Sequence, residues 1–251
     1  MSHTPRTILI TGATDGIGLA LACHYHAMGS QQILVGRRSI DTLDSALFTA
    51  ESYCRTDLSQ PGSATTIEQF LRDRGVERLD LLIHNAAIGF YGATEEQSAE
   101  SIRDLEAVNL RAPIALTHTL LPYLERARGT IAFISSVVSA LPAPDYAVYT
   151  ATKSALEGFA RSLRIELDGK VNVQVIRPGA TRTNMHERSG APLDKLGWER
   201  FPTAEVVAQQ IVGAIERGSP SATIGLTNQL LHTAGTHFDW VIDRFVQRRG
   251  R

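Results

Sequence analysis

Short runs of β-branched and aliphatic residues alternate along the chain with longer segments in which apolar residues recur at helical spacing. The runs predict strands at 7–11, 32–36, 52–56, 79–84, 129–135, 172–177 and 221–225. The segments between them predict helices near 17–28, 63–74, 95–126, 147–168, 203–217 and 226–248. Strands that alternate with crossover helices form parallel sheets covered on both faces. The pattern therefore predicts an α/β fold, a doubly wound sheet of about seven parallel strands with helices on both faces.

The length of 251 residues suits a single domain over 1–251, because α/β domains of this size often stay undivided. The segment 180–201 lies outside the regular alternation, and we expect it to form a lid over a substrate. The stretch 37–51 is short for a full crossover helix, so its conformation is left open.

Composition narrows the class of partner. A net charge of -1 creates no field that would gather nucleic acid or an anionic membrane, so we expect a small-molecule partner. Cys23 and Cys54 lie in no metal-ligand pattern, so no metal is expected. No secretory leader is recognisable and no apolar run approaches the roughly 20 residues of a membrane-spanning helix, which predicts a cytoplasmic protein.

A glycine-rich turn, TGATDGIG (11–18), joins the first predicted strand to the first helix. Glycines in that place let the backbone approach a pyrophosphate, which then lies at the helix N-terminus among free N–H groups. The alternative is a plain strand–turn–helix with structural glycines.

The second strand ends at Gly36 and is followed by Arg37 and Arg38, where a fold selective for NAD carries an acidic residue against the ribose hydroxyls. Two guanidiniums there suit a 2′-phosphate, which favours NADP over NAD. The alternative is a solvated surface pair.

Tyr149 and Lys153 are four residues apart in a segment of helical period, so both side chains leave one face of the helix. A tyrosine with a pKa of about 10 is a poor acid–base catalyst near neutral pH, and an adjacent ammonium stabilises its phenolate. Ser136 follows an apolar strand at its carboxyl end and is a candidate for holding the reacting oxygen, as are Ser135 and Ser139.

Together these residues resemble the short-chain dehydrogenase/reductase family from about Thr7 to Thr183. TGATDGIG is similar to the family's TGxxxGxG, Asp57-Leu58 to its acidic dipeptide at the adenine, and HNAAIG (84–89) to its NNAG segment. Asn109 falls where the family has a helix asparagine, and Ser136 lies 149 − 136 = 13 residues before Tyr149, the family spacing that selects it over its neighbours. Pro178-Gly179 with Thr181 and Thr183 resembles the PGxxxT segment that closes over the nicotinamide in relatives.

The resemblance implies a Rossmann-type fold with four catalytic residues. Tyr149 would be the acid/base, Lys153 would lower its pKa and hold the nicotinamide ribose, and Ser136 would orient the substrate oxygen. Asn109 would position a water that feeds protons to Lys153, the alternative being a helix residue that satisfies a backbone carbonyl. The expected coenzyme-binding residues are Gly12, Thr14, Asp15, Gly16, Ile17, Gly18, Arg37, Arg38, Asp57, Leu58, Asn85, Ala86, Tyr149, Lys153, Pro178, Gly179, Thr181 and Thr183.

Three departures from the family pattern stand out. His84 and Ala87 replace the first Asn and the Gly of NNAG. Asp15 stands where NADP-binding relatives often carry a basic or small polar residue, so its charge opposes Arg37 and Arg38. The C-terminus lacks the glycine-rich ending of many relatives and carries FDWVIDRFVQRRGR instead, whose apolar stripe favours core or a subunit interface over a membrane anchor. We expect a homodimer or homotetramer.

We therefore interpret the chain as an NADP(H)-dependent oxidoreductase that transfers a hydride between a nicotinamide and a carbonyl or alcohol carbon of a small to medium, largely apolar substrate. Two alternatives share the fold: an NAD-dependent alcohol dehydrogenase and a non-catalytic NADPH-binding regulator.

Overall fold

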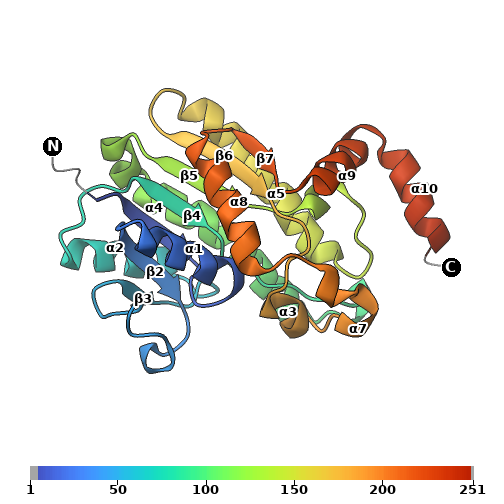
Figure 1. Ribbon diagram of the computed structural model, residues 1–251, viewed down its shortest axis with the longest axis horizontal. Coiled ribbons are helices and arrows are strands. Elements are labelled where there is room, and N and C mark those ends of the chain that lie inside the picture. Colours follow the sequence, from blue (N-terminus) through green and yellow to red (C-terminus); the bar gives the residue numbers. More distant parts are fainter. Residues whose placement is uncertain (1–4, 250–251) are drawn as a thin grey trace.

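The computed structural model describes residues 5–249, apart from the side chains of Lys195, Leu196, Asp239, Phe245, Arg248 and Arg249. Its seven parallel strands form one sheet in the order β3-β2-β1-β4-β5-β6-β7 (Figure 1). The strands are β1 (Thr7–Thr11), β2 (Gln31–Gly36), β3 (Tyr53–Arg55), β4 (Leu81–His84), β5 (Thr130–Ile134), β6 (Asn172–Arg177) and β7 (Ser221–Thr223). The predicted fold class is confirmed. The strand order reverses between β1 and β4, and a parallel sheet of this kind binds ligands at the carboxyl edge of that reversal.

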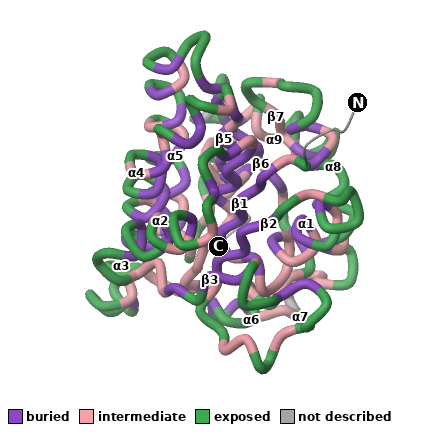
Figure 2. The backbone as a smooth tube through the Cα atoms, turned by 90° about the vertical axis from the view of Figure 1, so that its left-hand side faces the viewer, coloured by how far each residue is buried: buried purple, intermediate pink, exposed green. Residues whose placement is uncertain are grey.

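Helices cover both faces of the sheet because successive strand residues point to opposite sides. Leu9 of β1 packs in the core with α2 (Ser63–Asp73), α4 (Ala112–Ala127) and α5 (Ala147–Glu166). Its neighbours Ile8 and Ile10 pack on the other face with α1 (Gly16–Ala27) and α8 (Ala204–Glu216). Figure 2 shows the buried strands between these two helical layers.

The helix expected over 95–126 is interrupted. A 3₁₀ turn (Thr94–Glu96) precedes α3 (Ala99–Glu106), which is capped by the Ser98 hydroxyl, and a π-helical turn (Ala107–Arg111) separates α3 from α4. Pro113 has no N–H to donate to the carbonyl four residues earlier, and the Ala112 N–H bonds to Ala107 instead. The π turn carries Asn109.

The two segments without a predicted conformation are both compact. Residues 37–51 contain a 3₁₀ turn (Ile40–Thr42) and then bury Leu47 and Phe48, whose ring meets Tyr53 edge-on at 5.4 Å between centroids. The 180–201 segment forms α6 (Asn184–Arg188), α7 (Leu193–Leu196) and a 3₁₀ turn (Trp198–Arg200). A further 3₁₀ turn (Val137–Ala140) follows β5.

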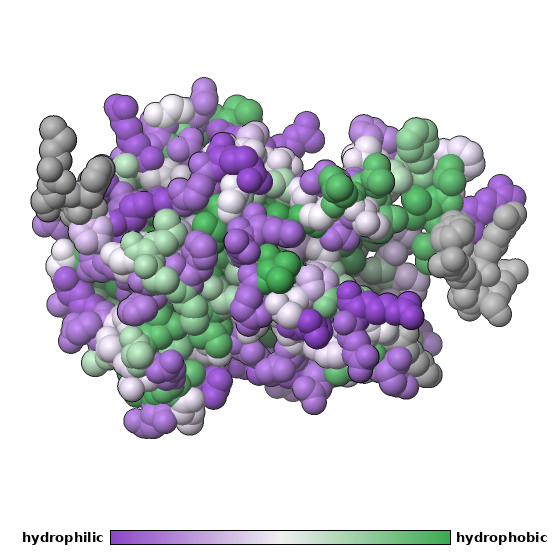
Figure 3. Space-filling model, viewed as in Figure 1, coloured by the Kyte–Doolittle hydropathy of each residue, from purple (hydrophilic) through white to green (hydrophobic). Residues whose placement is uncertain are grey.

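The C-terminal helix expected over 226–248 is two helices, α9 (Leu226–His237) and α10 (Asp239–Arg249), with the break at Phe238. Gly235 holds α9 close to the body, since a Cβ there would lie 2.0 Å from the Ala140 carbonyl oxygen. The stripe expected in a core or interface is not in the core: Phe238, Trp240 and Val241 are 57%, 67% and 42% exposed, while Phe245 lies outside the described side chains. Apolar residues gather over this end of the molecule (Figure 3). None of the helices between residues 5 and 249 has the length and apolar character that crossing a membrane requires.

Candidate active site

A cavity of about 410 Å³ opens at the carboxyl edge of the sheet, where the strand order reverses. It extends from the glycine-rich turn to the first turns of α5 and brings together nearly all the residues singled out in the sequence. These are Gly12, Thr14, Asp15, Gly16, Ile17, Gly18, Arg37, Asp57, Leu58, Asn85, Ala86, Ser136, Tyr149, Lys153, Pro178, Gly179, Thr181 and Thr183. Arg38 and Asn109 are not among the lining residues of this cavity.

The turn at one end of the cavity is a backbone cradle that side chains would fill. Gly12 has φ +66°, and a Cβ there would lie 2.8 Å from the Ala86 Cα. A Cβ on Gly18 would lie 2.1 Å from the Gly12 carbonyl oxygen. The glycines therefore let the start of α1 pack against the turn and leave its N-terminus facing the cavity, as a phosphate site needs.

Asn85 joins the ends of β1 and β4 beneath this cradle. Its amide nitrogen donates to the Thr11 and Gly12 carbonyls at 2.9 and 3.3 Å. The Thr11 hydroxyl accepts the N–H groups of Asn85 and Ala86 at 3.0 and 3.1 Å. The sequence resemblance pointed to Asn85, whereas Thr11 was missed although it is the first residue of the TGxxxGxG match.

Asp15 caps α1 and also contacts α6. One carboxylate oxygen accepts the Gly16 N–H at 2.8 Å, and the other lies 2.6 Å from the Arg188 guanidinium. The Asn184 amide donates to the two oxygens at 3.2 and 3.3 Å. The acid that opposed Arg37 and Arg38 in the sequence thus has a cation of its own, and no pattern in the sequence signalled this pairing of distant residues.

The two arginines after β2 differ. Arg37 lines the cavity, while the Arg38 guanidinium donates to the Thr42 carbonyl at 3.1 Å outside the lining. Gly36 brings the turn close to β2, because a Cβ there would lie 2.6 Å from the Thr14 methyl carbon. The Asp57 carboxylate accepts the N–H and hydroxyl of Ser59, each at 2.9 Å.

Tyr149 lies in the first turn of α5 at the opposite end of the cavity, only 8% exposed. Burial raises its pKa to about 12, against a smaller lowering from a hydrogen bond with Ser136. The direction differs from the lowering expected from Lys153, because desolvation of the phenolate is the largest effect. The phenol is therefore protonated at neutral pH.

Lys153 is 2% exposed and donates to the Ile134 carbonyl at 2.9 Å, with its ammonium 5.7 Å from the centre of the Tyr149 ring. Desolvation lowers its pKa to about 8, and the charge of Glu157, one turn further along α5, acts in the opposite direction. A buried lysine with such a pKa is able to exchange protons close to neutral pH.

Glu157 belongs to a polar cluster behind Lys153 that sequence reasoning missed. Its carboxylate accepts Arg177 Nε at 2.8 and 2.9 Å and the Ser135 hydroxyl at 2.7 Å. The available signal was positional: Glu157 follows Lys153 by four residues on α5, and Arg177 ends β6 just before Pro178.

Asn109 is fully buried. Its Oδ1 accepts the Ile88 N–H at 2.9 Å, and its Nδ2 donates to the Ile88 carbonyl at 2.9 Å and the Thr152 hydroxyl at 3.2 Å. The side chain thus fixes backbone that lines the cavity and the residue before Lys153. A water-positioning role at Lys153 stays a prediction.

Aromatic rings surround the cavity beside Tyr149. The Tyr146 ring meets those of Tyr149 and Tyr91 edge-on, with centroids 6.0 and 5.3 Å apart. From α6, His186 packs against Phe201, and Met185 lines the same wall. Burial lowers the pKa of His186, so this wall of the cavity is uncharged near neutral pH and largely apolar.

Comparisons with known proteins identify the family of the chain. The family model described as short chain dehydrogenase matches residues 6–193. Dehydrogenase/reductase SDR family member 7B of Rattus norvegicus is 33% identical over 230 residues, which cover 83% of this chain and 70% of the relative.

Two solved structures agree over nearly the whole length. A short-chain dehydrogenase from Streptomyces avermitilis has a TM-score of 0.80 at 27% identity, covering 100% of this chain and 98% of that one. A short-chain dehydrogenase from Sphingobium yanoikuyae in complex with NADPH has a TM-score of 0.79 at 26% identity, covering 95% and 96%. The chain therefore belongs to the short-chain dehydrogenase/reductase family and is an oxidoreductase that interconverts CH–OH and C=O groups.

Proposed function

We propose that the chain is an NADP(H)-dependent oxidoreductase that transfers a hydride between the nicotinamide and a carbonyl or alcohol carbon of a small to medium, largely apolar substrate, with Tyr149 as acid/base. One observation carries the proposal: a single cavity joins a glycine cradle at the N-terminus of α1 to Tyr149, Ser136 and Lys153. A nicotinamide dinucleotide carries a pyrophosphate at its middle and a reactive ring at one end, so it has a group for each of these two parts of the cavity.

The residues present fit a nicotinamide dinucleotide. The cradle closed by Gly12 and Gly18 would hold the pyrophosphate, Asp57 and Leu58 the adenine end, and Lys153 the nicotinamide ribose. When bound, the coenzyme supplies or accepts the hydride. The solved relative in complex with NADPH supports this class of ligand.

Tyr149 is set up as a proton donor. Its phenol is protonated because its pKa is about 12, and the hydrogen bond with Ser136 brings a second hydroxyl to the same point. In reduction, Tyr149 gives its proton to the substrate oxygen as the carbon accepts hydride, and Ser136 donates a hydrogen bond to that oxygen. The Lys153 ammonium then stabilises the phenolate and, with a pKa of about 8, returns a proton to it. Asn109 acts through position, by fixing Ile88 and Thr152.

Arg37 supports NADP rather than NAD, because this residue lines the cavity where β2 ends. Asp15 is not the only charge at its end of the cavity, because the Arg188 guanidinium, 2.6 Å from its carboxylate, adds a cation there that offsets the repulsion of a 2′-phosphate. The uncharged aromatic wall of Tyr146, His186 and Phe201 favours an apolar substrate, with the 180–201 segment as its lid. A homodimer or homotetramer and a cytoplasmic location remain predictions.

Fluorescence titration with NADPH and NADH, followed by assays on a panel of aldehydes and ketones, tests the proposal. We expect tighter binding of NADPH and turnover of apolar ketones or aldehydes. Tighter binding of NADH together with turnover would favour the NAD-dependent alcohol dehydrogenase. Binding without turnover of any carbonyl or alcohol would favour the regulator, and failure of wild-type protein to bind either coenzyme would overturn the proposed function.

A further inference from the structure

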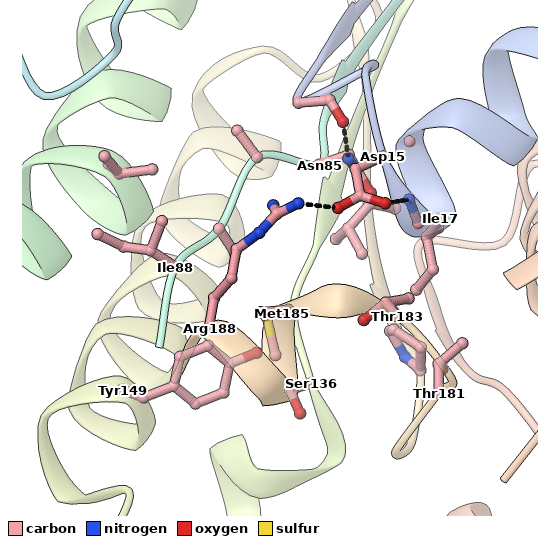
Figure 4. A pocket seen from close by; sticks show the side chains of 18 of the residues that line it. Asp15, Ile17, Asn85, Ile88, Ser136, Tyr149, Thr181, Thr183, Met185 and Arg188 are labelled. Carbon is pink, nitrogen blue, oxygen red and sulfur yellow. Dashed lines mark hydrogen bonds and ion pairs between the residues drawn. The ribbon is translucent and has the colours of Figure 1, made fainter. Parts of the chain in front are cut away.

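Three residues of the 180–201 segment contact two residues of the glycine-rich turn. Thr183 packs closely against Gly16, because a Cβ on that glycine would lie 2.8 Å from the Thr183 methyl carbon. Asn184 and Arg188, at the two ends of α6, both bond to Asp15. Figure 4 shows the Arg188 guanidinium pointing at the Asp15 carboxylate along the pocket. The segment is therefore docked on the N-terminus of α1.

The Asp15–Arg188 contact is weak as a stabilising element. The Arg188 side chain is 58% exposed and that of Asp15 is 28% exposed, and exposed ion pairs contribute little to stability. Its position is more informative, because both side chains line the cavity. Asp15 already caps α1 through the Gly16 N–H. Its carboxylate thus stands at the end of the helix where a dinucleotide's pyrophosphate binds.

From this geometry we infer that Arg188 is a coenzyme-binding residue, which leaves Asp15 and pairs with the pyrophosphate of a bound dinucleotide. Asp15 holds the guanidinium beside the helix N-terminus until a stronger anion arrives there. A pyrophosphate offers more negative charge and more acceptor oxygens than one carboxylate, and an arginine fork suits phosphate oxygens. The inference rests on the proposed function, since it assumes that a dinucleotide occupies this cavity.

Two roles for the contact predict different effects of removing each partner. If the ion pair only fixes the position of α6, losing Asp15 and losing Arg188 weaken coenzyme binding to the same extent. If Arg188 transfers to the pyrophosphate, losing Arg188 weakens binding, whereas losing the Asp15 charge removes a competitor and strengthens it. The pyrophosphate is common to both coenzymes, so NADPH and NADH respond in parallel.

The test is a fluorescence titration of Arg188→Gln, Asp15→Asn and wild-type protein with NADPH and with NADH. Asn keeps the cap on α1, because asparagine and aspartate are similarly good N-caps. We expect Arg188→Gln to raise Kd for both coenzymes about 5- to 50-fold, the range of a partly exposed charge-assisted hydrogen bond. Asp15→Asn is expected to lower both Kd values about two- to fivefold, as loss of a nearby like charge at the surface would. Arg200→Gln, an exposed arginine of the same segment, is the matched control and leaves Kd unchanged.

If Arg188→Gln and Asp15→Asn weakened coenzyme binding equally, the transfer of Arg188 to the pyrophosphate would be overturned, and the ion pair would only fix the position of α6. An Arg188→Gln effect on NADPH alone would place the guanidinium at the 2′-phosphate and would also overturn it. Unchanged affinity in Arg188→Gln, with wild-type protein still binding coenzyme, would reject this inference while leaving the proposed function intact. Wild-type protein that binds neither coenzyme would reject both.

Discussion

The Lys153 ammonium lies 5.7 Å from the centre of the Tyr149 ring, one turn along the same helix, and donates its hydrogen bond to the Ile134 carbonyl. Both groups are almost completely removed from water, and in both the charged form is disfavoured. Burial keeps the phenol protonated and brings the lysine pKa close to neutral pH. The two groups are therefore arranged for passing a proton, and their burial has consequences for activity and for stability.

Tyr149→Phe should lose about 10²- to 10⁴-fold of turnover, the usual contribution of a general acid. The ring and its packing against Tyr146 are kept, so the fold and the coenzyme site should be unaffected. Steady-state kinetics on the best carbonyl substrate would measure the loss, and a coenzyme titration would show an unchanged Kd. A variant that kept most of its turnover would show that Tyr149 is not the acid.

Lys153→Met should inactivate the enzyme and yet stabilise the fold at pH 7. The pKa of Lys153 falls from 10.5 to about 8 on folding, and at about 1.36 kcal/mol per pKa unit this costs the folded state about 3 kcal/mol. The substitution removes that cost, but it also leaves the Ile134 carbonyl without its hydrogen-bond donor, which destabilises the variant by about 1 kcal/mol. The net expectation is about 2 kcal/mol of added stability, measured by urea unfolding.

The difference in unfolding free energy between Lys153→Met and wild type should depend on pH, and this dependence is a sharper check. Between pH 8 and 10.5 the unfolded lysine still holds the proton that the folded protein has released, so wild-type stability rises with pH in this window. The advantage of Lys153→Met should therefore shrink from pH 8 to 10.5, whereas Tyr149 titrates in both proteins and cancels. A variant that is less stable than wild type at pH 7 would show that the buried charge costs little.

The sheet was predictable because its signals are local. β1 and β6 begin and end where their apolar runs do, and the other strands differ by a residue or two at their ends. The long helix over 95–126 was harder, since a helical period continues through the π turn around Asn109. Pro113 was the available signal, because it removes the donor for the Asn109 carbonyl.

The site was predictable where a motif fixes backbone or helical spacing and unpredictable where distant side chains meet. Tyr149, Ser136 and Lys153 converge because the end of β5 and the start of α5 bring them there. The pairing of Asp15 with Arg188 depends on how the 180–201 segment folds back over α1, which no local pattern encodes. No local pattern predicts the position of Arg38 either, whose guanidinium donates to the Thr42 carbonyl instead of lining the cavity.

Arg37→Ala should raise KM for NADPH about 10- to 100-fold, the effect of losing a charge-assisted hydrogen bond to a phosphate, and change KM for NADH little. Arg38→Ala should have a smaller effect, because the Arg38 guanidinium already donates to Thr42. Steady-state kinetics with NADPH and with NADH measure how far each variant changes KM for each coenzyme relative to wild type. Equal effects of Arg37→Ala on NADPH and NADH would show that Arg37 does not read the 2′-phosphate.

Glu157→Gln should destabilise the fold and shift the pH dependence of activity. Arg177 is 12% exposed, and removing its carboxylate partner leaves a largely buried cation, at a cost of about 3 kcal/mol in unfolding free energy. Because the charge of Glu157 raises the pKa of Lys153, its loss should move the basic limb of a pH–rate profile for reduction to lower pH. Arg177→Met provides the comparison, since it breaks the same ion pair but keeps the carboxylate near Lys153. If both variants lost stability and neither moved the profile, Glu157 would hold the sheet together without tuning the lysine.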